Sequence, residues 1–280
     1  MKAEFRENAT RSLGAAGLDI SIYDDCFLER SIERRIAVAG ANSESAYLEL
    51  LEKDRGEAMA LFDSLHVGFS EFFRNPLSFA CLERIVLPAL AERKKAGDDR
   101  ELRIWSAACA EGQEAYSAAI LCDELLSTTD SGLSCRVFAT DIDERALAAA
   151  AAGVYDSAAL GNVSLKRLTA YFSKKADAFA LVPRIRGSVE FSVFDLLTNG
   201  GTCPPMSIYG DFDIVFCGNL LFYYKPERRK RILERIIDCL APGGYLVTGE
   251  AEREIVARHH FREAFPASAV FRIGGAGGTR

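Results

Sequence analysis

Residues 102–120, LRIWSAACAEGQEAYSAAI, combine a strand-like pattern, a turn and a helical pattern in one short stretch. An apolar run over 102–108 ends in small residues, which is typical of a buried strand. Gly112 then precedes a helical pattern in which Tyr116 and Ile120 share one face. The stretch therefore predicts a strand, a turn and a helix in succession, which is the opening of a βαβ unit.

The same order recurs along the rest of the chain. Further strands are predicted at 135–141, 189–195, 212–219, 244–250 and 269–273, with helices at 144–152 and from Pro226 onward. Strands that alternate with helices predict a mostly parallel, doubly wound α/β sheet. Asp141, Asp195 and Asn219 each end a predicted strand. Because ligands bind at the carboxyl ends of such strands, we expect these three side chains to converge on one crevice.

Two regions fall outside this alternation. Residues 1–95 show only helical spacing, and the charged stretch 92–100 is expected to be a linker. We therefore expect an all-helical N-terminal domain over 1–95 and the α/β domain over 96–280. Within the latter, a small antiparallel hairpin is predicted to turn near Arg186 and Gly187, giving a β subdomain at about 173–191. The Gly-rich residues 274–280 are expected to be disordered.

Composition narrows the classes of function. The 280 residues are 49% apolar and 26% charged, the ordinary balance of a soluble globular protein. No apolar run reaches the ~18 residues of a membrane-spanning helix, and no secretory signal is visible. A net charge of −6 argues against a general nucleic-acid binder. The eight cysteines form no C-x-x-C pair, so we expect no metal site and a cytoplasmic protein with reduced thiols.

The turn after the first strand decides between cofactors. A dinucleotide fingerprint needs G-x-G-x-x-G, whereas this turn, AACAEGQEA, contains only Gly112, so NAD and FAD are not expected. Asp141, at the end of the second strand, stands where an acid holds a ribose diol. With Asp195 at a later strand end, this pattern suggests S-adenosylmethionine. The alternative is an α/β domain whose strand-end acids are merely solvated.

Five blocks of sequence resemble the CheR family, the chemotaxis receptor glutamate O-methyltransferases, and occur in that family's order. They are SEFFRNPLSF (70–79), RIWSAACAEGQEAYS (103–117), FATDIDERALAAAAAGVY (138–155), FDIVFCGNLLFYY (212–224) and LAPGGYLVTGEAE (240–252). The resemblance implies a Rossmann-like S-adenosylmethionine methyltransferase domain, an all-helical N-terminal domain and a small β subdomain. It also implies transfer of methyl groups to glutamates of chemoreceptor-type signalling proteins, with S-adenosylhomocysteine as product.

The resemblance further implies roles for individual residues. Glu114 matches the acid at the methionine end of the cofactor, and Asp141 matches the acid that holds the ribose. Arg74 and Tyr223 are the predicted catalytic residues, expected to hold the acceptor carboxylate. The full set of expected cofactor contacts comprises Ser70, Arg74, Glu114, Asp141, Asp195, Leu196, Gly218 and Asn219, of which Asp195 and Leu196 match the adenine-side pair.

Some positions depart from the family's usual pattern. Gly68 stands where relatives usually have Asn, and Gly218 where they usually have Arg. Each change removes a side-chain hydrogen bond worth about 1 kcal/mol. An alternative function is therefore a catalytically weakened CheR-like regulator that binds S-adenosylmethionine or a receptor without efficient transfer. A methyltransferase for some other acceptor is a third hypothesis.

The expected partner is the helical cytoplasmic methylation region of a chemoreceptor. Arg30 and Arg34 share one face of a predicted helix, with Arg35 beside them, and such a face could meet acidic receptor helices. The alternative is an ordinary solvated helix face. The hairpin is short, which argues against tethering to a receptor tail. We expect a monomer that inserts into no membrane and binds no nucleic acid.

Overall fold

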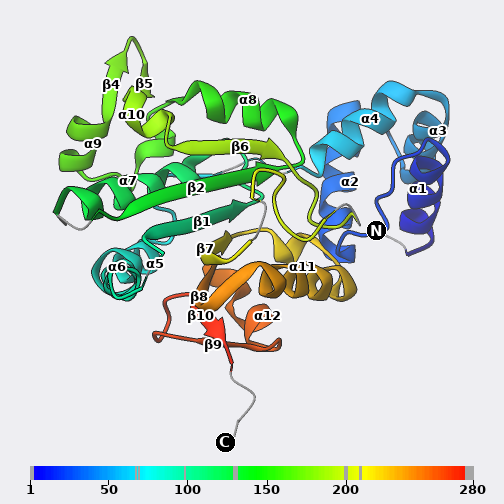
Figure 1. Cartoon of the computed structure of the whole chain (residues 1–280). Helices are drawn as coiled ribbons and strands as arrows, with labels where there is room; N and C mark the ends of the chain where they lie inside the picture. The colour runs from blue at the N-terminus through cyan, green and yellow to red at the C-terminus, as the bar shows by residue number, and fades with distance from the viewer. Residues whose placement is uncertain are drawn as a thin grey trace, which may run out of the picture. The chain divides into compact units, whose positions relative to one another are not determined.

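The computed structural model describes residues 3–66, 68, 70–97, 99–128, 132–198, 201–207 and 210–274. The chain divides into two compact units (Figure 1). Unit 1 comprises Met1–Val67 and Phe222–Arg229, and unit 2 comprises Gly68–Leu221 and Lys230–Arg280.

Unit 1 is built from four helices: α1 (Ala3–Ala15), α2 (Asp25–Ala39), α3 (Glu44–Lys53) and α4 (Arg55–Ser64). Their apolar faces form one core, in which Leu13, Ile32 and Leu61 have no exposed surface. Asp24 caps the start of α2 by accepting a hydrogen bond from the Cys26 amide, and Gly40 ends that helix in a left-handed conformation. The short segment 222–225 joins this unit, since the Asp24 amide donates to the Tyr223 carbonyl at 2.8 Å.

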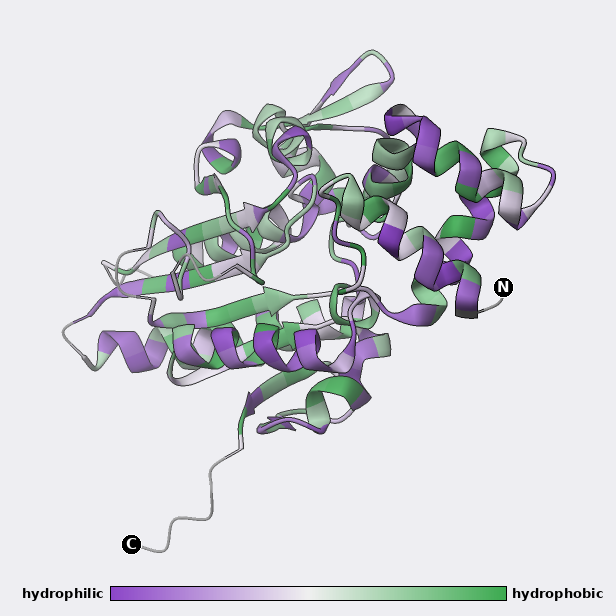
Figure 2. Cartoon of the chain, turned by 90° about the vertical axis from the view of Figure 1, so that its right-hand side faces the viewer, coloured by the Kyte–Doolittle hydropathy of each residue, from purple (hydrophilic) through white to green (hydrophobic). Residues whose placement is uncertain are grey.

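Unit 2 is built around a seven-stranded sheet in the order β6-β2-β1-β7-β8-β10-β9. Its strands are β1 (Glu101–Ala107), β2 (Ser134–Asp141), β6 (Val189–Val193), β7 (Phe212–Cys217), β8 (Leu240–Thr248), β9 (Phe261–Glu263) and β10 (Val270–Ile273). The first five strands in the sheet order are parallel, and β10 is antiparallel to both β8 and β9. Hydrophobic residues predominate along these strands (Figure 2) because both faces of the sheet are covered.

Helices and short helical turns lie before β1 and between the later strands. They are α5 (Pro76–Cys81), η1 (Leu82–Val86), α6 (Leu87–Lys95), α7 (Gln113–Thr128), α8 (Glu144–Ala152), η2 (Ala158–Leu160), α9 (Leu165–Tyr171), α10 (Pro183–Arg186), η3 (Leu221–Tyr223), α11 (Pro226–Cys239), η4 (Glu250–Glu252) and α12 (Arg253–Ala257). The predicted doubly wound α/β sheet is confirmed, including the helices over 144–152 and from Pro226.

The small β subdomain differs in detail from the prediction. Its three strands, β3 (Val154–Tyr155), β4 (Phe172–Lys175) and β5 (Ala178–Leu181), pair in the antiparallel order β3-β5-β4. The hairpin turns at Ala176 and Asp177, and Figure 1 shows it projecting from the main sheet. The prediction of a turn near Arg186 and Gly187 was wrong, because those residues end the short helix α10. Residues 189–191 belong to β6 in the main sheet, outside the small one.

The boundary of the helical region also differs from the predicted residue 95. Helices α5, η1 and α6 belong to unit 2 rather than to the N-terminal helical unit. Phe79, for example, stacks on Phe216 of β7 with ring centroids 5.8 Å apart. The helical spacing over 76–95 was interpreted correctly as helix. However, these helices pack on the sheet of unit 2 and not on the N-terminal helices. The predicted linker 92–100 begins inside α6, which continues to Lys95.

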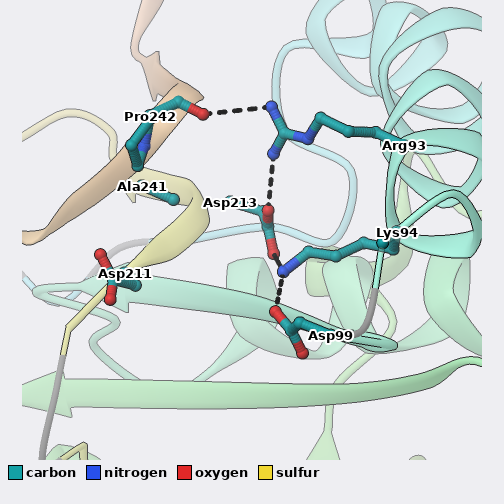
Figure 3. Close-up of a pocket in the computed structure, with 8 residues that line it drawn as sticks. Arg93, Lys94, Asp99, Asp211, Asp213, Ala241 and Pro242 are labelled. Atoms are coloured by element: carbon teal, nitrogen blue, oxygen red, sulfur yellow. Dashed lines mark hydrogen bonds and ion pairs between the residues drawn. The ribbon is translucent and has the colours of Figure 1, made fainter.

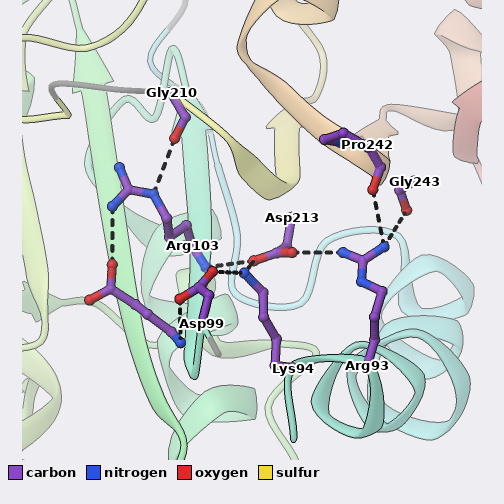
Figure 4. A network of polar contacts seen from close by, with 9 residues as sticks. Arg93, Lys94, Asp99, Arg103, Gly210, Asp213, Pro242 and Gly243 are labelled. Carbon is purple, nitrogen blue, oxygen red and sulfur yellow. Dashed lines mark hydrogen bonds and ion pairs between the residues drawn. The ribbon is translucent and has the colours of Figure 1, made fainter. Parts of the chain in front are cut away.

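A network of charged residues fastens α6 to the amino-terminal edge of the sheet (Figure 4). The Asp213 carboxylate of β7 is buried, with 1% of its side chain exposed, and pairs with Arg93 at 2.8 Å and Lys94 at 3.1 Å. It also accepts the Arg103 amide of β1 at 3.1 Å. Since Arg93 and Lys94 belong to α6 and Arg103 belongs to β1, this carboxylate of β7 joins α6, β1 and β7 at one point.

Two further observations concern the expectations from composition. No helix in the described ranges is long and apolar enough to cross a membrane. All eight cysteines are free. Of the terminal stretch predicted to be disordered, residues 275–280 lie outside the described residues.

Candidate functional site

The candidate site lies where the parallel strands of unit 2 end. Because β1, β2, β6 and β7 run in the same direction, their carboxyl ends meet at one edge of the sheet. Asp141 is the last residue of β2 and lies opposite Val193 of β6. Asp195 and Asn219 follow β6 and β7 by two residues each. The structure therefore brings the three predicted strand-end groups to the same edge of the sheet.

The turn between β1 and α7 has an unusual backbone. Ala108, Ala110 and Gly112 all adopt positive φ, at 60°, 48° and 87°. For alanine this conformation is strained, and such strain gathers at functional sites. At Gly112 a side chain would also be crowded, since a Cβ there would lie 3.0 Å from the Cβ of Ala150 and 3.2 Å from the Phe191 ring. The single glycine that the sequence offers in this turn is thus required for the turn to approach α8 and β6.

Asp141 fixes this turn and keeps capacity for a ligand. One carboxylate oxygen, Oδ2, accepts the Ala110 amide at 2.8 Å, and the other, Oδ1, accepts the Asp143 amide at 3.0 Å. An ionised carboxylate offers about four acceptor positions. Two therefore remain for further donors, which suits the two hydroxyl groups of a ribose.

Glu114 is the acid of the first turn of α7. Its Oε1 accepts the Ser106 hydroxyl at 2.7 Å, and its Oε2 lies 2.8 Å from the position that a Cβ on Gly218 would occupy. Removal from water raises the pKa of Glu114 to about 7, with the Ser106 hydrogen bond opposing the shift. The charge of Glu252 raises this pKa further, while that of Arg74 lowers it. A cationic ligand group would favour the ionised form of Glu114.

The segment that carries Arg74 is held from several sides. The Phe72 amide donates to the Ala159 carbonyl at 3.0 Å, and the Phe73 amide donates to the Ser117 hydroxyl at 2.9 Å. Phe73 and Asn75, the two neighbours of Arg74, both adopt left-handed backbone with φ of 53° and 61°. The fold therefore maintains local strain on both sides of this arginine, which is partly buried and acts electrostatically on Glu114.

The end of β6 lies next to the end of β2. The Phe194 backbone amide donates a hydrogen bond to the Asp141 backbone carbonyl at 3.0 Å. This bond places Asp195, the next residue, close to Asp141 in space. The Asp195 carboxylate accepts the Leu197 amide at 2.7 Å, and its backbone carbonyl accepts the Arg235 guanidinium at 2.9 Å. Leu196 is only 7% exposed.

Two other predicted residues are placed less directly. Ser70 lies in unit 2 and is half-buried. Tyr223 lies in unit 1, where its ring contacts Phe27 with centroids 4.7 Å apart. The proposed cooperation of Tyr223 with Arg74 stays a prediction.

A pocket of about 360 Å³ lies at the opposite, amino-terminal edge of the sheet (Figure 3). It is lined by Arg93, Lys94, Gly97, Asp99, Asp211, Asp213, Ala241 and Pro242. The charges of Arg93, Lys94 and Asp213 are paired with one another in the network that fastens α6. We therefore assign this pocket a structural role and place the functional site at the carboxyl edge.

Comparison with known proteins identifies the family of the chain. Residues 68–269 match the model of the CheR methyltransferase SAM-binding domain, and residues 4–66 match the CheR methyltransferase all-alpha domain. The chain belongs to the CheR methyltransferase family. The boundary between the two CheR domains falls at the division between units 1 and 2, which corrects the predicted boundary at residue 95.

Individual CheR relatives agree with this assignment. Chemotaxis protein methyltransferase 1 of Pseudomonas aeruginosa is 37% identical over 76% of this chain and 76% of its own length. The chemotaxis protein methyltransferase of Escherichia coli is 31% identical over 89% of this chain and 84% of its own. An uncharacterized 104.1 kDa protein of Rhodobacter capsulatus is 32% identical over 85% of this chain, which spans only 24% of that protein. The predicted family and its cofactor, S-adenosylmethionine, are confirmed.

Sequence reasoning missed several residues at this CheR site. Ser106 is fully buried on β1 and is recognisable as the partner of Glu114 only in three dimensions. Ile142, directly after Asp141, is apolar and 51% exposed, and the sequence reasoning did not single it out. Glu252 is fully buried beside Asn219, and the sequence alone shows only an acid in a charged stretch.

Proposed function

We propose that this chain transfers the methyl group of S-adenosylmethionine to glutamate side-chain carboxylates of chemoreceptor-type signalling proteins, giving glutamyl methyl esters. The proposal rests mainly on one observation. Glu114, Asp141 and Asn219 are grouped at the carboxyl edge of the sheet, in a domain that matches the CheR methyltransferase SAM-binding domain. The names of the relatives support chemotaxis proteins as the setting.

We assign the cofactor to this edge of the sheet by the chemistry of its side chains. Glu114 suits the ammonium group of the methionine end, because it is a carboxylate in the first turn of α7 whose Oε1 is held by the Ser106 hydroxyl. Asp141 suits the ribose, because two of its acceptor positions remain. Ile142 offers an exposed apolar surface beside Asp141 for the adenine ring, and Asp195 is positioned nearby for the polar edge of that ring.

Little acid–base catalysis is required of the protein. A glutamate side chain has an ordinary pKa of about 4.3, so the acceptor is already ionised at neutral pH and needs no general base. When bound, S-adenosylmethionine supplies an electrophilic methyl group on its sulfonium. The tasks left to the chain are to orient the acceptor carboxylate, to exclude water and to hold the reacting groups in line.

Arg74 is the residue we propose for orienting that carboxylate. A guanidinium can bind a carboxylate through two parallel hydrogen bonds, which sets the direction of attack. The left-handed residues on either side of Arg74 and the anchored amides before it support a site role rather than a purely structural one. Tyr223 is the second proposed contact for the acceptor, on the strength of the family resemblance.

The proposed partner is the helical methylation region of a cytoplasmic receptor domain, and we place the protein in the cytoplasm as a monomer. Within unit 1, the Arg30 and Arg34 side chains of α2 are exposed and suit an acidic receptor helix. Arg35 is unsuited to this role, because it pairs with Glu57 at 2.6 Å and is mostly buried. The proposed contact face therefore keeps Arg30 and Arg34 of the three predicted arginines and omits Arg35.

A transfer assay tests this function. The purified chain is incubated with S-adenosylmethionine labelled in the methyl group and with cytoplasmic fragments of several receptors. We expect label on the receptor that is released as methanol by mild base, as an ester requires. Arg74→Ala should abolish the transfer. Base-stable label would indicate another acceptor, and cofactor binding without transfer to any receptor would indicate the regulator that binds without catalysis.

A further inference from the structure

Glu252 is a buried carboxylate whose hydrogen-bond donors, in the part of the chain that the structure describes, are backbone amides. It ends the short turn η4 and has no exposed surface. Its Oε2 accepts hydrogen bonds from the backbone amides of Asn219 at 2.7 Å and Gly249 at 3.0 Å. Its Oε1 accepts one from the backbone amide of Leu221 at 2.5 Å. No ion pair to Glu252 occurs among the described residues.

A carboxylate in this position is costly, so its contacts must compensate. Burial raises the pKa of Glu252, and the hydrogen bonds from Gly249, Asn219 and Leu221 lower it. An apolar residue of similar size would avoid the burial of charge but would leave three backbone amides without acceptors. The carboxylate is thus the group that satisfies the turn after β7.

That turn presents Asn219 in a defined orientation. Asn219 adopts left-handed backbone, with φ of 61°. Its side-chain amide nitrogen lies only 2.6 Å from the position that a Cβ on Gly249 would occupy. The amide can therefore occupy this place only because residue 249 has no side chain. Glu252 fixes the backbone of Asn219 and Gly249 leaves room for its side chain.

The same turn lies against the cofactor acid. A Cβ on Gly218 would fall 2.8 Å from Oε2 of Glu114, so the residue before Asn219 is packed on Glu114. A shift of this turn would change the surroundings of Glu114 and the direction in which the side-chain amide of Asn219 points.

We propose that Glu252 is a positioning residue of the methyl-transfer site, which holds the turn 218–221 so that Asn219 meets the cofactor. This inference rests on the proposed function, because it takes Asn219 as a cofactor contact. Glu252 itself touches neither cofactor nor acceptor. It acts through the backbone amides of the turn.

The test measures S-adenosylhomocysteine binding by calorimetry at pH 8, where Glu114 is already largely ionised, so that loss of the Glu252 charge changes the ionisation of Glu114 little. Glu252→Gln keeps the size of the side chain but places an NH₂ group against backbone donors, and we expect the Kd to rise about tenfold, as for a lost charge-assisted hydrogen bond. The matched control is Glu250→Gln, an exposed acid in the same turn, whose Kd should equal that of wild type. Wild-type affinity in Glu252→Gln would overturn the inference.

A double-mutant cycle separates positioning from general damage to the fold. If Glu252 acts through Asn219, adding Glu252→Gln to Asn219→Ala should raise the Kd by less than about twofold further. Independent, multiplying effects would overturn the inference. Should Glu252→Gln fail to fold, Gly249→Ala serves instead. Its φ of −69° accepts alanine, and the new Cβ would lie 2.6 Å from the side-chain nitrogen of Asn219 and 3.0 Å from Oε2 of Glu252, so it displaces the Asn219 side chain and crowds the carboxylate that holds the turn.

With Gly249→Ala we expect the same rise in Kd and the same lack of effect in the Asn219→Ala background. An unchanged Kd would contradict the inference. Failure of the proposed function is distinguishable from failure of the inference. A wild-type chain that does not bind S-adenosylhomocysteine refutes the function and the inference with it, whereas wild-type binding with unaffected variants refutes the inference alone.

Discussion

The ionisation of Glu114 should make cofactor binding depend on pH. Its pKa in the free protein lies at about 7 because burial disfavours the charged form. Binding of an ammonium group requires the ionised carboxylate, so the apparent affinity should follow the ionised fraction. With a pKa near 7, that fraction is about one-tenth at pH 6 and about nine-tenths at pH 8. The Kd for S-adenosylhomocysteine should therefore fall about tenfold between these two pH values.

The assay is calorimetric titration at pH 6, 7 and 8 in buffers of different ionisation heat. These also report the proton that Glu114 releases on binding. Glu114→Gln should bind weakly and show a flat profile, which separates Glu114 from any ionisation of the ligand. Glu111→Gln, at an exposed position nearby, should keep the wild-type profile. A wild-type Kd that is constant from pH 6 to 8, with no proton released, would refute the reasoning.

Three further predictions concern stability and partner binding. Asp213→Asn should lower the free energy of unfolding, measured by urea denaturation, by about 3 kcal/mol, because a buried ion pair loses one partner. The control Asp211→Asn, at an exposed site nearby, should leave the free energy of unfolding unchanged. Gly112→Ala should cost about 2 kcal/mol in the same measurement and should weaken cofactor binding, because it combines a left-handed backbone with a 3.0 Å clash; unchanged stability would contradict this account of the turn. Reversal of charge at Arg30 and Arg34 should reduce methyl transfer to a receptor fragment about tenfold and leave the cofactor Kd unchanged; equal transfer would show that this face is merely solvated.

The sequence predicted the architecture because buried strands and amphipathic helices leave a periodic record. The strand that ends at Asp141 and the strand that precedes Asn219 were located from that record alone, as was the helix over 144–152. The boundary at residue 95 failed because helical spacing shows that a face is apolar but not what it covers. The hairpin turn at Ala176 carries no glycine although its φ is 50°, so it gave no local signal.

The site was only partly predictable for a similar reason. Glu114 and Asp141 occupy positions that a strand, turn and helix pattern makes recognisable. Ser106 and Glu252 could not be found this way, because their roles depend on contacts between elements far apart in the sequence. Glu252 is 33 residues from Asn219, and only the fold brings its carboxylate to that amide.

Placement of the cofactor at the carboxyl edge of the sheet can be tested by calorimetric titration of the wild-type chain and of Asp141→Ala with S-adenosylhomocysteine and S-adenosylmethionine. We expect micromolar binding to the wild type and no measurable binding to Asp141→Ala, since this variant lacks the carboxylate that fixes the turn and that we propose as the acceptor of the ribose hydroxyls. Undiminished binding to Asp141→Ala would contradict the placement of the cofactor at the carboxyl edge of the sheet. Absence of binding to the wild type would contradict the proposed methyltransferase function itself.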